Sequence, residues 1–100
     1  MNRAAQRRVD KFRHIGCIAC HLQGHFNPGY DVHHLVDKGT RALSGGDIAS
    51  IPLCPSHHRG HPGVQGPTLA NNKRAFVELF GTERQLLVLV NELLETQVIA

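Results

Sequence analysis

The sequence predicts a small α+β protein, and three features of its pattern lead to that prediction. The first thirteen residues are rich in basic side chains at helical spacing, the middle contains one clear strand, and the last third repeats apolar residues with the period of a helix. A chain of 100 residues suits a single domain, residues 1–100, with a modest hydrophobic core. Helices are therefore expected on both sides of a short strand region.

Residues 2–13 are predicted to form a basic helix, on which Ala4, Ala5, Val9 and Phe12 make a thin apolar stripe. Five of the eleven lysine and arginine residues lie in the first thirteen positions, although the net charge is only +3. Such a cluster suits a polyanion, and a solvated helix face explains it equally well.

The middle of the chain has an unusual composition. Nine of the ten glycines and all five prolines fall between positions 16 and 67, and all eight histidines and three cysteines fall between positions 14 and 61. Because such a segment buries little apolar surface, we expect a bound metal to supply the missing folding energy. Three cysteines cannot all pair internally, which favours a reducing compartment. No membrane-length apolar run or signal-like start is seen, so no membrane association is expected.

The best strand candidate is residues 30–36, which end with the adjacent histidines His33 and His34. Residues 37–50 are expected to form a polar loop with a turn at its glycine pair. Residues 51–53 are predicted to be extended and to complete a hairpin with the first strand.

The segment after the hairpin is predicted to contain one short helical turn. Pro55 suits its first position because proline lacks an N–H, and Gly60 suits its exit. On such a turn Cys54 and His57 lie on one side, whereas His58 points roughly 100° away. A cysteine–histidine pair facing one way and a second histidine facing another predict two metal sites, back to back.

Two cysteine pairs of equal spacing point to a structural zinc. The Cys17-Ile18-Ala19-Cys20 segment has the two-residue spacing that presents both thiolates to one ion. A redox disulfide motif uses the same spacing, usually in a βαβ setting that this chain lacks. The expected ligands form a closed tetrahedron and are Cys17, Cys20, Cys54 and His57. His58 and His21 remain alternatives for the fourth position.

Four histidines are left for a second site once the zinc ligands are assigned. They are His33, His34, His58 and His61. An incomplete imidazole set leaves coordination positions open to water and substrate, as catalysis requires. Two alternative functions make no catalytic use of these histidines. A non-catalytic zinc module could bind nucleic acid through its basic N-terminus, and a thiol redox protein would leave Cys54 and the histidines unexplained.

Two helices are predicted in the last third of the chain. The first runs from residue 69 or 72 to residue 80 and ends at Gly81. Its predicted buried residues are Phe76, Leu79 and Phe80. Thr82 and Gln85 then have the form of a capping box that opens the second helix. The apolar face of that helix is predicted to consist of Leu86, Leu89, Val90, Leu93 and Leu94. Both helices are expected to pack and to carry no chemistry.

The histidine pair, the hairpin and the Leu-Cys-x-x-His-His sequence at a helix start resemble the HNH, or ββα-metal, nuclease superfamily in its zinc-braced form. The resemblance is closer still to the phage recombination-enhancement (Ref) nucleases, which act on DNA held by RecA filaments, over roughly residues 12–94. The segments that carry it are Cys17-Ile18-Ala19-Cys20, His33-His34, Ile51-Pro52-Leu53-Cys54-Pro55-Ser56-His57-His58-Arg59-Gly60, Ala75-Phe76, Phe80-Gly81-Thr82-Glu83 and Leu86-Leu87.

This resemblance implies a zinc-braced ββα-metal, treble-clef-like core and a metal-dependent DNA endonuclease of the bacterial or phage-infected host cytoplasm. It implies His34 as general base, with His33 and His58 as ligands of a catalytic Mg²⁺, Mn²⁺ or Zn²⁺ ion. We expect His61 to be a further ligand or a phosphate contact. DNA is the implied substrate and the RecA–single-stranded DNA filament the implied partner. The central Asn of the HNH pattern has no counterpart, and Asp47 is the nearest carboxylate.

Overall fold

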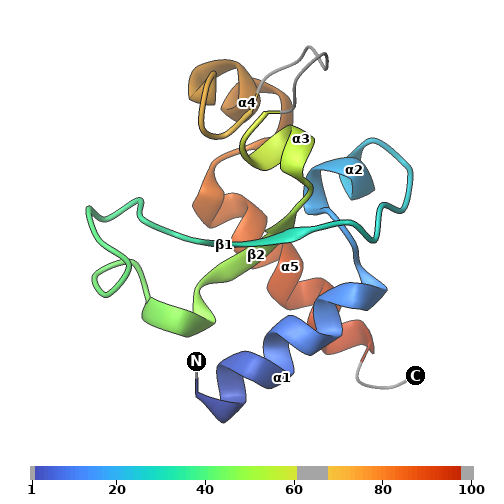
Figure 1. Cartoon of the computed structure of the whole chain (residues 1–100), viewed down its shortest axis with the longest axis vertical. Helices are drawn as coiled ribbons and strands as arrows, with labels where there is room; N and C mark the ends of the chain where they lie inside the picture. Colours follow the sequence, from blue (N-terminus) through green and yellow to red (C-terminus); the bar gives the residue numbers. More distant parts are fainter. Residues whose placement is uncertain (1, 61–67, 98–100) are drawn as a thin grey trace.

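A computed structural model describes residues 2–60 and 68–97 and shows helices arranged around a two-stranded sheet (Figure 1). The α+β class predicted from the sequence is confirmed. The elements in chain order are α1 (Arg3–Lys11), η1 (Phe12–His14), α2 (Ile18–Leu22), β1 (Asp31–His34), η2 (Gly46–Ile48), β2 (Ser50–Leu53), α3 (Pro55–His58), α4 (Lys73–Phe80) and α5 (Glu83–Gln97).

The basic N-terminal helix α1 is attached to the core and is not a separate arm. Ala5 and the following Phe12 are fully buried, whereas Ala4, expected on the same stripe, is exposed. One residue corresponds to about 100° around a helix, so Ala4 points away from the core when Ala5 points into it. Arg8 donates a hydrogen bond to the Ser50 carbonyl at 2.8 Å, which ties α1 to the sheet.

The two strands form the antiparallel hairpin that the sequence predicts. His33 lies opposite Ile51 and His34 lies opposite Ser50. All four residues of β2 are buried, and those of β1 are half-buried. Helices α2 and α5 pack against β2, and α5 passes behind the hairpin in Figure 1. Strand β1 therefore holds its two histidines at the edge of the core.

The first cysteine pair lies at the start of a short helix, α2. Cys17 caps α2, and its Sγ accepts a hydrogen bond from the Cys20 N–H at 3.4 Å. The preceding Gly16 has a φ of +69°, and a Cβ on it would lie 2.4 Å from the Asn27 carbonyl oxygen. A glycine is therefore required where the chain enters this cysteine turn.

The C-terminal helices pack largely as the sequence predicts, with one exception. Phe76 is fully buried and Phe80 is half-buried, but Leu79 is 65% exposed, so its predicted burial is wrong. The buried stripe of α4 runs through positions four apart, and Leu79 lies about 100° around the helix from Phe80. Figure 1 shows α4 at one end of the molecule, away from α1.

The predicted capping box at the start of α5 is confirmed. The Thr82 N–H donates to Gln85 Oε1 at 2.8 Å, and the Gln85 N–H donates to Thr82 Oγ1 at 3.1 Å. Gly81, with a φ of +100°, separates α4 from α5. The apolar residues of α5 that face the core are Leu86, Leu87, Val90 and Leu94, with Leu89 and Leu93 partly buried.

Within residues 2–60 and 68–97, no helix has the length and apolar character needed to cross a membrane. Residues 61–67, between α3 and α4, lie outside the part of the chain that the structure describes.

Candidate active site and metal centre

Helix α3 directs its two histidines to different neighbours, as the sequence predicts. Cys54 occupies the N-cap position and Pro55 the first helical position. The Nδ1 atom of His57 lies 3.2 Å from the Cys54 Sγ atom, whereas His58 faces strand β1. The change of direction follows from the rotation of about 100° between neighbouring helical residues.

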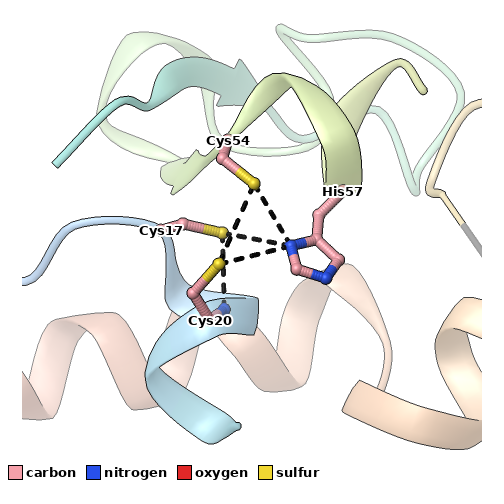
Figure 2. Close-up of side chains that lie close together, drawn as sticks. All are labelled: Cys17, Cys20, Cys54 and His57. Carbon is pink, nitrogen blue, oxygen red and sulfur yellow. Dashed lines mark hydrogen bonds between the residues drawn. The ribbon is translucent and has the colours of Figure 1, made fainter. Parts of the chain in front are cut away.

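Four ligand atoms from α2 and α3 converge on one point (Figure 2). They belong to Cys17, Cys20, Cys54 and His57 and all lie within 4.8 Å of one another. The Nδ1 atom of His57 is 3.6 Å from the sulfurs of both Cys17 and Cys20, and the sulfurs of Cys20 and Cys54 are 3.9 Å apart. Ligand atoms of a tetrahedral zinc are separated by about 3.5–3.8 Å, so the four residues fit that ion.

The three cysteines of this cluster are buried, and His57 is half-buried. Burial raises the pKa of the Cys17 thiol to about 12 and also raises the pKa of Cys20, so both thiols stay protonated unless a metal displaces the proton. Burial lowers the pKa of His57, which keeps its imidazole neutral and able to bind a metal. The Phe80 ring packs against the His57 ring at a centroid distance of 5.2 Å. The cluster could therefore hold a structural zinc.

The fourth position of this cluster is occupied by His57 and by neither of the alternatives. His21 is exposed on α2, and His58 lies against β1. The three cysteines form no disulfide with one another.

A second histidine cluster lies between β1 and α3. The Nδ1 atom of His33 is 3.2 Å from the Nε2 atom of His58, and the two rings meet edge to face. Both histidines line a cavity of about 200 Å³. The other residues that line it are Val36, Leu69, Ala70, Lys73 and Glu83. Two imidazole nitrogens at this separation beside an open cavity can bind one metal ion together.

A carboxylate lies behind each of the two histidines. His58 Nδ1 is 3.2 Å from Asp31 Oδ2, and His33 Nε2 is 3.5 Å from Glu83 Oε1. Glu83 is only 4% exposed, and its contact with His33 outweighs the opposing effect of burial and holds the pKa of its carboxyl below the usual range. The expectation that α5 only packs is wrong in this respect, because its first residue reaches the histidine cluster.

The sequence contains a signal for Glu83 that the periodicity analysis overlooked. Glu83 precedes Leu87, Val90 and Leu94 by four, seven and eleven residues and so lies on the buried face of α5. A carboxylate on the apolar face of a helix is rarely buried without a partner, and the partner of Glu83 is His33.

His34 faces a different set of neighbours from His33. Its Nε2 atom lies 4.0 Å from Asp47 Oδ1, and Asp47 pairs with Arg41 at 2.7 Å. Neighbouring residues of a strand point to opposite faces, which separates His34 from the His33–His58 pair. Burial, followed by the positive charge of Arg41, lowers the pKa of His34 and favours its neutral form. Within the described chain, its Nε2 atom is buried and makes no hydrogen bond.

The remaining predicted site residue, His61, lies outside the described residues.

Comparison with known protein families finds a match over most of the chain. The model of a family described as "Recombination enhancement, RecA-dependent nuclease" matches residues 2–95 of the chain. The match includes the cysteine–histidine cluster, the histidine pair and nearly all of α5. Comparisons with curated proteins and with solved structures find no match.

The geometry predicts that the purified protein contains about one zinc ion per chain at the cysteine–histidine cluster. We expect His57→Ala to lower the zinc content and to destabilise the fold, whereas His58→Ala retains this zinc because its ring faces Asp31 and His33. Elemental analysis of both variants measures the difference. A folded wild-type protein without metal would contradict the assignment.

Proposed function

The chain belongs to the family of recombination-enhancement, RecA-dependent nucleases, and on that premise we propose that it is a metal-dependent, HNH-type DNA endonuclease. In this proposal it hydrolyses phosphodiester bonds in DNA that RecA has bound. The observation that carries the metal-dependent part is the pair of imidazole nitrogens, His33 Nδ1 and His58 Nε2, that lie 3.2 Å apart beside a cavity.

The histidine pair is proposed to hold a divalent ion, separately from the zinc. A bound Mg²⁺, Mn²⁺ or Zn²⁺ ion would stabilise the charge that develops on the scissile phosphate and on the leaving oxygen. Only two protein nitrogens converge there in the described residues, which leaves room for water and substrate oxygens. The cysteine–histidine cluster supplies four protein ligands and so has no such open position.

His34 is proposed as the general base that takes a proton from the attacking water. Its neutral form is favoured by burial, and its Nε2 atom is buried beside Asp47, which leaves Nδ1 as the nitrogen that would take the proton. The Asp47 carboxylate, 4.0 Å away, is close enough to stabilise the imidazolium once the proton has moved. Asp47 would then take part of the role of the central Asn in the HNH pattern.

DNA is proposed to contact the outer face of α1. Arg3, Arg7 and Lys11 are exposed on this helix, whereas Arg8 is half-buried and bonded to Ser50 and Asn91. Exposed arginine and lysine side chains attract phosphates without regard to base sequence. This face would therefore contribute affinity for DNA, whereas the histidines would carry out the cleavage.

The direct test incubates the purified protein with single-stranded DNA, duplex DNA and duplex paired by a RecA filament, each with and without Mg²⁺, Mn²⁺ or Zn²⁺. We expect weak cutting of duplex alone and stimulated cutting where RecA has paired a strand, in both cases only with a divalent ion. Equal cutting with and without RecA would leave an ordinary HNH endonuclease. Binding without any cutting would instead support the zinc-dependent nucleic-acid-binding module.

We expect His34→Ala to lower the cleavage rate by about 10²–10⁴-fold, because that is the usual contribution of a general base. Zinc content, folding and DNA affinity should stay near wild type. His14→Ala, at an exposed histidine of η1, is a matched control that should cut normally. Full activity of His34→Ala would show that HNH chemistry is not centred on this residue.

Replacing Arg3, Arg7 and Lys11 by glutamine is expected to weaken DNA binding and to reduce its dependence on salt. Each lost phosphate contact makes the negative slope of log K against log salt shallower by about 0.9. The control is Arg74→Gln, which removes one positive charge on the exposed side of α4 and is compared with each single replacement on α1. Binding titrations at several salt concentrations measure both slopes. An unchanged slope would show that α1 presents only a solvated face.

A further inference from the structure

Four side chains form a row across the second cluster, in the order Asp31, His58, His33 and Glu83. His58 Nδ1 lies within hydrogen-bonding distance of Asp31 Oδ2, at 3.2 Å, whereas His33 Nε2 faces Glu83 Oε1 at 3.5 Å, an ion-pair distance without hydrogen-bond geometry. The other two ring nitrogens face each other at 3.2 Å. The row joins β1, α3 and the first residue of α5, which are three separate parts of the fold.

The carboxylates determine where each neutral imidazole carries its proton. A neutral imidazole has one N–H, and an ionised carboxylate can only accept a hydrogen bond. The proton of His58 is therefore favoured on Nδ1, facing Asp31, and the proton of His33 on Nε2, facing Glu83. The two nitrogens left without a proton, His33 Nδ1 and His58 Nε2, then direct their lone pairs at each other.

From this row we infer that Glu83 and Asp31 are positioning residues that hold His33 and His58 as paired ligands for one divalent cation. The inference rests on the proposed function, because that proposal places the ion at the histidine pair. Carboxylates that accept a hydrogen bond from the outer nitrogen of a metal-bound histidine fix the ring and make its inner nitrogen a stronger ligand. Two lone pairs 3.2 Å apart repel each other, and a cation between them removes that repulsion.

Glu83 is held in place by contacts of its own. The Val36 N–H donates to its Oε2 atom at 3.3 Å, while its Oε1 atom faces His33 and lies 3.7 Å from the ammonium group of Lys73. A buried carboxylate is costly unless such partners satisfy it. The two carboxylate oxygens of Glu83 therefore have different partners: Oε2 accepts from the backbone after β1, and Oε1 faces the His33 imidazole.

Asp31 is the more accessible of the two carboxylates. Arg59 Nε donates to its Oδ2 atom at 2.9 Å, and the same oxygen faces His58 Nδ1. Its side chain is 30% exposed, so its replacement threatens the core less than replacement of Glu83.

If Glu83 had a purely structural role, its replacement would have a different effect on ion binding. Glu83 stands in the first turn of α5, where a negative charge favours the helix, and it pairs with Lys73. If that were its whole role, removing the charge would lower stability and leave ion binding at the histidine pair unchanged. Ion affinity therefore separates the two roles.

The test is calorimetric titration of the zinc-loaded full chain with Mn²⁺, an ion that prefers nitrogen and oxygen ligands to thiolates and so spares the zinc cluster. The variants are Glu83→Gln and Asp31→Asn, and the control is Glu92→Gln, at an exposed position of α5. Glutamine has one carbonyl oxygen where Glu83 uses two, so it cannot accept from both Val36 and His33.

We expect both variants to bind Mn²⁺ about 10–100-fold more weakly than wild type, with zinc content and the control unchanged. Circular dichroism and zinc analysis verify folding, and Asp31→Asn carries the test if Glu83→Gln does not fold. Folded variants with wild-type Mn²⁺ affinity, or a wild-type protein that takes up no Mn²⁺, would overturn the inference.

Cleavage assays on the same samples separate this result from the proposed function. Wild-type protein that binds Mn²⁺ more tightly than the variants but never cuts DNA would overturn the nuclease proposal and leave the positioning role intact. If the wild-type protein cuts DNA and the variants bind Mn²⁺ as tightly as the wild type, the nuclease proposal stands and the positioning role is overturned.

Discussion

The structure depends on the convergence of three cysteine sulfurs and one imidazole nitrogen between α2 and α3, all within 4.8 Å. This cluster connects two segments that lie on either side of the hairpin in the sequence. A divalent cation that displaces the thiol protons would hold these segments together, and its binding free energy would then stabilise the fold. With α3 fixed at His57, the next residue, His58, is directed toward β1.

Two simple geometric rules then separate the candidate zinc ligands from the other histidines. The rotation of about 100° between helical neighbours sends His57 to the cysteines and His58 to the histidine pair. The alternation of side chains along a strand sends His33 toward His58 and His34 toward Asp47. Two pairs of adjacent histidines thus reach three different environments, and a proposed base, a proposed metal ligand pair and a zinc ligand can coexist in a chain of 100 residues.

Local patterns predicted much of this arrangement, and contacts between distant segments explain what they missed. Cysteine spacing, the proline and glycine around α3, and the Thr82–Gln85 capping box depend on neighbouring residues, so the sequence reveals them directly. The exposure of Leu79 depends on which side of α4 the rest of the chain covers. The contact between Glu83 and His33 joins residues 50 positions apart, which no local period encodes. The 4.0 Å contact between Asp47 and His34 likewise forms only when the loop after β1 folds back.

The central claim is that a closed zinc cluster and an open histidine pair are separate metal sites on either side of α3. The most direct measurement is an anomalous X-ray scattering experiment on crystals soaked in Mn²⁺, recorded at the zinc and manganese absorption edges. We expect a zinc peak among the four cysteine and histidine ligands and a manganese peak between His33 Nδ1 and His58 Nε2. A difference map with no metal between those two nitrogens, or with no zinc among the cysteines, would contradict it.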